Sequence, residues 1–166
     1  KDMKALFDTI LTAVPAPHGD PDAPLQILVA ALDYDNYLGQ IAIGRVFRGS
    51  ITPREPVLVL GKDGQSQAQT VEKIFVFQGL QRIEVPIALS GEILAISGLD
   101  NVSIGDTISS YEQPERLPTI DIDEPTVMMT FGVNTSPFMG REGTHCTSRM
   151  LHDRLMRELQ TNVSLR

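Results

Sequence analysis

The stretch Gly39-Gln-Ile-Ala-Ile-Gly-Arg-Val-Phe-Arg-Gly49 decides the fold that we expect for this chain. Its isoleucine, valine and phenylalanine residues favour an extended strand, and glycines bound the run at both ends. Gly44 lies inside the strand, which indicates either a bulge or a close approach of neighbouring backbone. Arg45 and Arg48 lie near one end of the stretch. Strict alternation places them on opposite faces of a sheet unless a bulge intervenes.

Short apolar runs on both sides repeat this pattern, separated by Gly, Asp, Asn and Ser. The sequence predicts strands over residues 25–32, 39–47, 56–60, 68–77, 83–88, 92–98 and 106–109. Many short strands without intervening helices are typical of a small closed or nearly closed barrel, since closure protects the strand edges. We therefore predict a mainly β fold, with a β-barrel domain over residues 25–110.

The residues before the barrel have a different pattern. Residues 1–14 place apolar side chains three and four positions apart, which predicts one amphipathic helix. Residues 15–24 contain four prolines. They cannot continue the helix and are predicted to form a linker.

The residues after the barrel begin with a second predicted linker, the polar and proline-bearing segment 111–119. The sequence then predicts a strand over 126–133, a helix over 146–159 and the start of another strand over 162–165. A β-α-β unit of this kind normally belongs to a larger sheet. We therefore predict a partial α+β domain over residues 120–166.

Composition limits the possible functions. The 166 residues hold 14 Lys and Arg against 21 Asp and Glu, for a net charge of −7. This balance excludes a generally basic nucleic-acid-coating protein, but it allows a local basic patch. Basic residues exceed acidic ones in segments 41–85 and 140–166. The single cysteine suits a reducing compartment, and neither a long apolar run nor a signal peptide is present. We predict a cytoplasmic location and no membrane partner.

Motifs for nucleotide and metal binding are missing from the sequence. The glycines of a P-loop are absent around Gly61-Lys62, and Asp33-x-Asp35 lacks the glycine that a calcium loop needs. Cys146, close to His145 and His152, leaves a thiol nucleophile open. The alternative is a partly buried small thiol between two surface histidines. In the last helix, Asp153 can pair with Arg157 one turn after it, or instead with Arg149 one turn before it.

Three motifs in the barrel region resemble the second domain of the translational GTPases, the elongation factor Tu-like β-barrel. They are Leu38-Gly-x-Ile-x-Ile-Gly-Arg-Val-x-Arg-Gly-x-Ile51, Leu89-Ser-Gly-Glu-Ile-x-Ala-Ile-x-Gly-Leu99 and Ile104-Gly-Asp-Thr-Ile108.

Four further motifs are narrower and resemble the BipA/TypA family of ribosome-associated GTPases. They are Leu6-Phe-Asp-x-Ile10, Asp123-Glu-Pro-Thr-Val-Met-Met-Thr-Phe131, Asn134-x-Ser-Pro-Phe138 and Thr147-Ser-Arg-x-Leu-x-Asp-Arg-Leu-x-x-Glu-Leu159. Together with the barrel motifs, the resemblance runs over essentially the whole chain.

The resemblance implies that GTP hydrolysis and ribosome contact belong to different parts of the parent protein. Residues 1–14 look like the C-terminal helix of a GTPase domain whose remainder is missing, and residues 120–166 look like half of a ferredoxin-like domain. GTP and Mg²⁺ are then expected for the parent protein but not for this segment, which would carry no catalytic residue. The implied partner is ribosomal RNA and protein of the small subunit rather than DNA, in stress adaptation or ribosome assembly. Gln40 and Thr144 stand where the family often has a basic residue.

We therefore predict a non-catalytic segment that docks a GTPase on the ribosome and couples nucleotide state to that contact. The predicted contact residues are Arg45, Arg48, Lys73, Arg82, Arg141 and Arg149. Two alternatives remain at this point: an enzyme that uses Cys146, and a module that self-assembles through the open sheet edge of the last domain.

Overall fold

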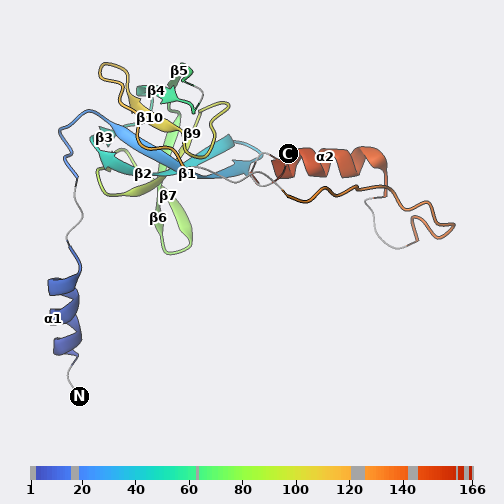
Figure 1. The fold of residues 1–166 in the computed structure, drawn as a ribbon, viewed down its shortest axis with the longest axis horizontal. Helices are drawn as coiled ribbons and strands as arrows, with labels where there is room; N and C mark the ends of the chain where they lie inside the picture. Colours follow the sequence, from blue (N-terminus) through green and yellow to red (C-terminus); the bar gives the residue numbers. More distant parts are fainter. Residues whose placement is uncertain are drawn as a thin grey trace.

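The structure is a computed structural model that describes residues 3–15, 19–62, 64–120, 126–141, 146–159, 161, 162 and 165. Its elements in chain order are α1 (Lys4–Ala13), β1 (Gln26–Asp35), β2 (Gly39–Arg48), β3 (Ser50–Ile51), β4 (Pro56–Leu60), β5 (Ser66–Thr70), β6 (Lys73–Gln78), β7 (Gln81–Glu84), β8 (Ala88–Leu89), β9 (Ile93–Ser97), β10 (Thr107–Ser110) and α2 (Ser148–Leu159). Figure 1 shows the strands gathered in one body, with α1 and α2 on either side of it. The predicted mainly β fold is confirmed.

The main sheet has the order β5-β4-β10-β1-β2-β9-β6-β7, and each neighbouring pair is antiparallel. β5 and β6 follow each other in the chain but lie near opposite ends of this order. Residues 71–72 must therefore cross the gap, which requires the sheet to curl into a barrel. The Val71 amide donates to the Glu55 carbonyl at 3.1 Å, whereas the Glu72 amide donates to the Ser97 carbonyl at 2.9 Å.

Two of the predicted strands are wrong in extent. Residues 68–77 form two strands, because the crossing at 71–72 changes the hydrogen-bonding partner. Residues 83–88 also divide: β7 ends at Glu84, and β8 pairs with β3 in a separate two-stranded sheet. Pro86 lies between them and has no N–H group to continue a ladder.

The barrel interior holds an aliphatic core. The side chains of this core come from β1, β2, β4, β6, β9 and β10 of the main sheet, from the small β3–β8 sheet and from the loops that join the strands. The core consists of Leu25, Ile27, Val29, Ala42, Val46, Ile51, Val57, Val59, Val71, Ile74, Ala88, Leu94, Ile96, Leu99, Val102 and Ile108. Since apolar burial supplies most of the folding free energy, this region is the stable part of the described chain.

Two glycines of the motif around β2 permit close backbone contacts. A Cβ atom at Gly44 would lie 2.4 Å from the Leu28 carbonyl oxygen, so the close approach predicted from the sequence is confirmed. Gly49 has a φ of +77°, and a Cβ there would lie 2.6 Å from the Leu25 Cα. Only glycine combines that dihedral with that contact. The Gly49 amide also donates to the Asp20 carbonyl at 2.7 Å, which ties the incoming chain to the barrel.

Residues 111–120, which we call the strap, return along the outside of β10. The sequence predicts a linker over 111–119, yet these residues are bonded to the barrel. The Leu117 amide donates to the Thr107 hydroxyl at 3.0 Å, and the Gln26 side chain donates to the Glu115 carbonyl at 3.1 Å.

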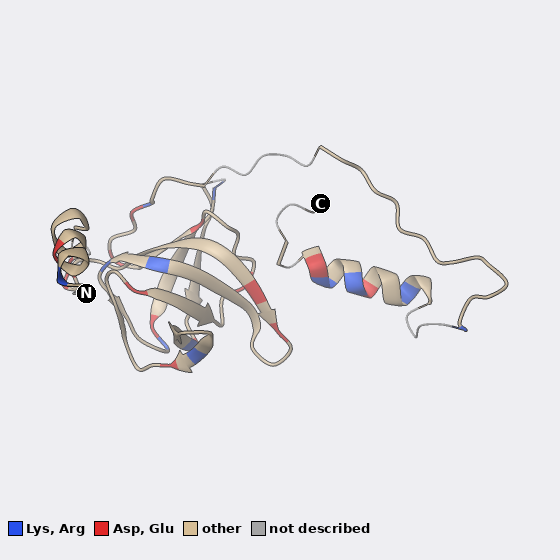
Figure 2. Cartoon of the chain, turned by 90° about the horizontal axis from the view of Figure 1, so that it is seen from below, with Lys and Arg blue, Asp and Glu red and all other residues tan. Residues whose placement is uncertain are grey.

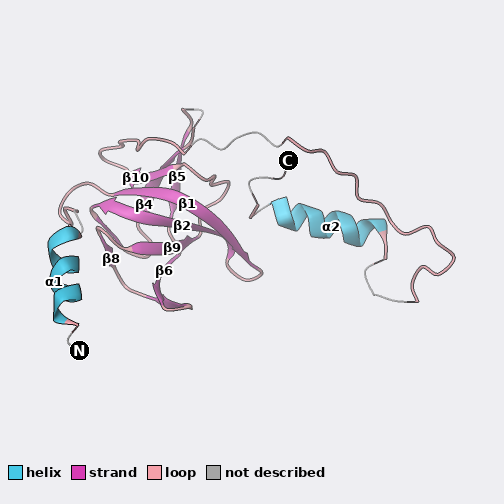
Figure 3. Ribbon diagram, turned by 60° about the horizontal axis from the view of Figure 1, so that its bottom comes forward, coloured by secondary structure: helices cyan, strands magenta, loops and turns pink. Residues whose placement is uncertain are grey.

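The segment after residue 125 differs from its prediction. Residues 126–133, expected to be a strand, form none, whereas the expected helix is present as α2. A strand needs a neighbour for its backbone N–H and C=O groups. The expected neighbour, 162–165, includes residues 163 and 164 outside the described part, and its described residues 162 and 165 are not in a strand. Figure 3 shows the segment as a long loop that turns back to α2. The open sheet edge expected for self-assembly is therefore not found among the described residues.

Candidate functional site

β2 carries one exposed residue of the predicted contact set, Arg45. Its side chain points outward, and its guanidinium carbon lies 5.4 Å from the centroid of the Phe47 ring. Across the sheet, Arg45 stands opposite Ile93 of β9, which is 59% exposed. Phe77 of β6 is also 40% exposed. Arg45 thus lies in an exposed surface that also holds aromatic and aliphatic side chains, and cation–π contact orients its guanidinium.

Arg48 lies only three residues away but has different surroundings. The β1–β2 register pairs Gln26 with Arg48 and Ile27 with Val46, so Phe47 is an extra residue in β2. The bulge left open by the sequence is therefore present. Arg48 forms an ion pair with Glu115 of the strap through its Nη2 atom, while its Nε atom is buried without a hydrogen-bond partner.

Lys73 and Arg82 are both engaged with carboxylates of the barrel. Lys73 Nζ lies 2.9 Å from Glu84 Oε2 on β7. Arg82 Nη1 of β7 lies 3.0 Å from Asp33 Oδ2 of β1, although β2, β9 and β6 separate these strands in the sheet order. The second contact is possible because the sheet curls. The Arg82–Asp33 pair ties the outermost hairpin, β6–β7, to β1, whereas the Lys73–Glu84 pair joins the two strands of that hairpin.

The remaining two predicted contact residues lie outside the barrel. The Arg141 guanidinium lies 5.1 Å from the centroid of the Phe138 ring. Arg149 of α2 is 3.9 Å from Asp153 of the next turn, the second of the two pairings left open by the sequence, and its side chain is 91% exposed. Figure 2 shows basic and acidic segments mixed along α2 and over the barrel. The structure does not bring the six predicted residues together into one patch.

Sequence reasoning missed the acidic partners of the barrel residues Arg48, Lys73 and Arg82. Asp33 and Arg82 are 49 positions apart, and Arg48 and Glu115 are 67 apart. No local pattern reports contacts over such separations. Gln40, noted for its lack of charge, donates to the Val102 carbonyl at 2.9 Å and accepts from the Val102 amide at 3.2 Å. Its amide group therefore fixes a loop, which a basic side chain could not do in the same way. Thr144 lies outside the described residues.

The β1–β2 turn beside Gln40 contains the carboxylate with the clearest electrostatic perturbation. Asp35 Oδ1 accepts hydrogen bonds from the amides of Tyr37 at 2.8 Å and Leu38 at 3.2 Å. These N–H groups hold the pKa of Asp35 below its usual value because they stabilise the charged form, and the Tyr37 amide has the larger effect. The carboxylate thus fastens the turn that joins β1 to β2.

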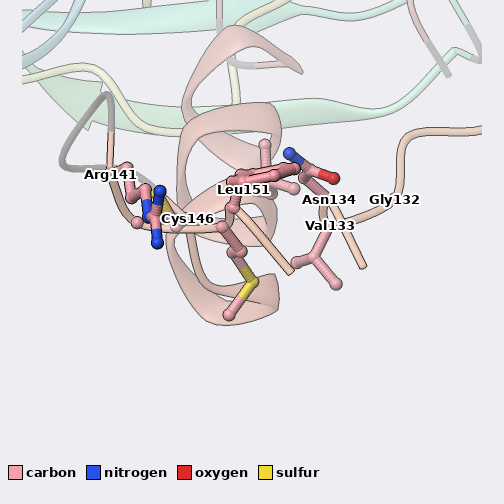
Figure 4. Close-up of a pocket in the computed structure, with 9 residues that line it drawn as sticks. Gly132, Val133, Asn134, Arg141, Cys146 and Leu151 are labelled. Atoms are coloured by element: carbon pink, nitrogen blue, oxygen red, sulfur yellow. The ribbon is translucent and has the colours of Figure 1, made fainter. Parts of the chain in front are cut away.

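Cys146 lines a cavity of about 610 Å³ between α2 and the preceding loop. Figure 4 shows Arg141, Asn134 and Leu151 around the same cavity. His152 Nδ1 lies 3.7 Å from Asp153 Oδ1, and its side chain is exposed; His145 lies outside the described residues. In the described part of the chain, no group of three or more His, Cys, Asp and Glu residues is placed to hold a metal ion. Nor does any described helix have the length and apolar character needed to cross a membrane.

Comparison with known proteins bears directly on the barrel. Residues 39–109 match the family described as elongation factor Tu domain 2. A protein of Synechocystis sp. named large ribosomal subunit assembly factor BipA is 49% identical over all 166 residues of this chain. The resemblance to the BipA/TypA family is confirmed. Proteins of the same name from Bacillus subtilis and Salmonella typhimurium are each 46% identical over the same 166 residues.

The shared sequence is a part of each BipA relative. The chain spans 28% of the length of the Synechocystis protein and 27% of the other two. The family match to elongation factor Tu domain 2 begins at Gly39, the first residue of β2, and ends at Ser109 in β10. It therefore covers most of the curled sheet, whereas the similarity to BipA also includes α1, the strap and α2.

Proposed function

We propose that this chain is a ribosome-docking and coupling segment of a BipA-like translational GTPase, acting in the cytoplasm in ribosome assembly or stress adaptation. One observation carries the proposal: all 166 residues align, at 45–49% identity, with proteins named as large ribosomal subunit assembly factors. In this role the segment binds the ribosome and transmits the nucleotide state to that contact, while GTP hydrolysis takes place elsewhere in the parent protein.

The docking chemistry that we propose centres on Arg45. Ribosomal RNA presents phosphates to cations and unpaired bases to aromatic side chains. Arg45 offers both features, because no carboxylate in the described part of the chain pairs with it and Phe47 lies beside it. Arg141 and Phe138 form a similar cation–aromatic pair in the C-terminal segment. Arg48, Lys73, Arg82 and Arg149 have carboxylate partners, which reduces their attraction for a phosphate.

The coupling role rests on how the barrel holds its two flanking segments. The chain before it is tied through the bond from Gly49 to Asp20, and the chain after it is tied through the strap. A rotation of the barrel on a docked ribosome would therefore be passed to both segments. GTP and Mg²⁺ are assigned to the parent protein by the family resemblance, and no step of the proposed function uses them here.

Co-sedimentation with ribosomal subunits tests the docking proposal. We expect the full chain to sediment with isolated small subunits, with an affinity that falls as salt rises because bound counterions are released from phosphates. Arg45→Glu should weaken binding and reduce the salt slope by about one or more. Arg157→Glu makes the same charge change at an exposed position of α2, eight residues from Arg149, and serves as the matched control.

Two results would contradict this proposal. Binding that is insensitive to salt and equal in wild type and Arg45→Glu would remove electrostatic docking through β2. Sedimentation with large subunits alone would remove the predicted small-subunit contact and leave a different ribosomal partner.

A further inference from the structure

The strap is held by polar side chains that the barrel buries for this purpose. Thr107 and Ser109 are fully buried, and Gln26 is 5% exposed. Buried polar groups are costly unless they form hydrogen bonds. Their partners are in the strap: the Leu117 amide donates to Thr107 Oγ1, the Glu115 amide donates to Ser109 Oγ at 3.2 Å, and Gln26 Nε2 donates to the Glu115 carbonyl.

Arg48 and Glu115 add the charged contact at the centre of this surface. Glu115 engages Arg48 through Nη2 only, and the Arg48 Nε atom is buried without a partner. A guanidinium presents its donors as a planar fork that a carboxylate or phosphate can engage with two oxygens. The ion pair therefore leaves the Nε donor of Arg48 unused. The Glu115 side chain is 63% exposed, so an anion from solvent can approach this ion pair and compete with Glu115 for the Arg48 guanidinium.

We propose that Glu115 is an internal competitor for phosphate at Arg48, so that binding of an RNA phosphate there and release of the strap are linked. A phosphate that takes both Nη2 and Nε must displace the Glu115 carboxylate. The strap then loses its charged contact and keeps only its neutral hydrogen bonds. By linkage, whatever loosens the strap also favours the phosphate by the same factor.

This inference rests on the proposed docking of ribosomal RNA and adds direction to it. Docking through Arg48 would free the strap, and with it the position at which the chain leaves the barrel for the C-terminal segment. A barrel that has no such contact keeps the strap closed. The contact between Arg48 and Glu115 thus links RNA binding at the barrel to the position of the C-terminal segment.

The closed state is tested first without RNA, by hydrogen exchange of the Leu117 amide in the full chain. Glu115→Gln removes the charge but keeps a side chain of the same size. We expect the Leu117 amide to exchange several-fold faster in this variant, with the Val46 amide in the barrel unchanged. Glu112→Gln removes a charge from the same strap without touching Arg48 and should exchange like wild type. Equal Leu117 exchange in Glu115→Gln and wild type would overturn the proposal.

The competition is tested with a labelled single-stranded oligouridylate of twenty nucleotides. We expect Glu115→Gln to bind it several-fold more tightly than wild type, and the RNA to speed Leu117 exchange in wild type but not in Arg48→Gln. RNA binding that leaves Leu117 exchange unchanged in wild type would overturn the linkage and leave the docking function intact. Absence of RNA binding in both wild type and Glu115→Gln would overturn the linkage together with electrostatic docking.

Discussion

The barrel and the C-terminal segment carry equally clear sequence patterns, yet they reach very different degrees of burial. In the barrel, alternation along β9 places Leu94 and Ile96 in a core where both are fully buried. In α2, the apolar stripe has the right helical spacing, but no residue of the helix is buried. The strand motif before it leaves Met128 95% exposed.

The difference shows that a periodic pattern specifies which face an element must cover, but not that a partner is at hand. The barrel strands pair with one another in a continuous curled order, so each apolar face meets another. α1 and α2 each present an apolar stripe that no described element covers. A local pattern gives local structure, whereas folding free energy comes from the contact of two such faces.

Removing the same side chain in the two regions should give the largest contrast. Leu94→Ala deletes a fully buried side chain, and we expect it to lower the free energy of barrel unfolding by about 3 kcal/mol, through lost burial and a cavity. Leu159→Ala at the end of α2, where the leucine is 39% exposed, should lower it by less than about 0.5 kcal/mol. Urea unfolding followed by circular dichroism measures both. Equal losses would mean that α2 is part of the same cooperative unit as the barrel.

Adding one methyl group tests the same contrast through the backbone. Gly44→Ala places a Cβ atom against the Leu28 carbonyl, and we expect a loss of about 2 kcal/mol in the free energy of unfolding. Gly132→Ala is the matched control, because nothing lies within 4 Å of its Cβ position. We expect this control to be neutral in the same unfolding measurement. An unchanged free energy of unfolding in Gly44→Ala would show that β1 and β2 can separate at Gly44 without cost.

Gln40→Ala tests a single polar contact within the barrel. The substitution leaves the amide and carbonyl of Val102 without the side-chain partner that they now share. We expect a loss of about 1 kcal/mol, as for other hydrogen bonds of this kind, and faster exchange of the Val102 amide. Gln69→Ala is a useful comparison, because Gln69 makes the same two-way contact with Asp100 at a more exposed site. Gln69→Ala should therefore lower the free energy of unfolding by less than Gln40→Ala does. Unchanged exchange at Val102 would argue against the contact.

The smallest effect that we predict concerns pH and the β1–β2 turn. The folded pKa of Asp35 is below its unfolded value, so its contribution to stability is present above about pH 4. That contribution is lost as pH falls through the folded pKa, because the protonated carboxyl accepts the Tyr37 and Leu38 amides less well. The exchange of these two amides, corrected for intrinsic rate, should rise in that range. Asp35→Asn keeps an acceptor but removes the titration, so its profile should be flat. An equal rise in exchange in Asp35→Asn would mean that a group other than Asp35 causes the effect.

The sequence predicted the barrel more fully than the docking surface. The strand over 56–60 has the predicted ends, and the role of Gly44 follows from its place inside a strand. The break at 71–72 could not be predicted, because its cause is a change of partner from Glu55 to Ser97 across the barrel. Four of the six predicted contact residues have carboxylate partners, which lie on another strand, on the strap or, for Arg149, one helical turn away. Apart from the partner of Arg149, these could not be read from the local sequence.

The sequence by itself determined the type of the barrel strands and of the two helices, and the resemblance of the chain to a family, since apolar spacing, glycines and prolines act within a few residues of one another. The tertiary structure alone decided which cations are left for a partner. Arg45 and Arg48 are neighbours in one motif, but the curled sheet and the strap give Glu115 to Arg48 and leave Phe47 beside Arg45. Electrostatic pairing depends on distance in space, which local sequence does not encode.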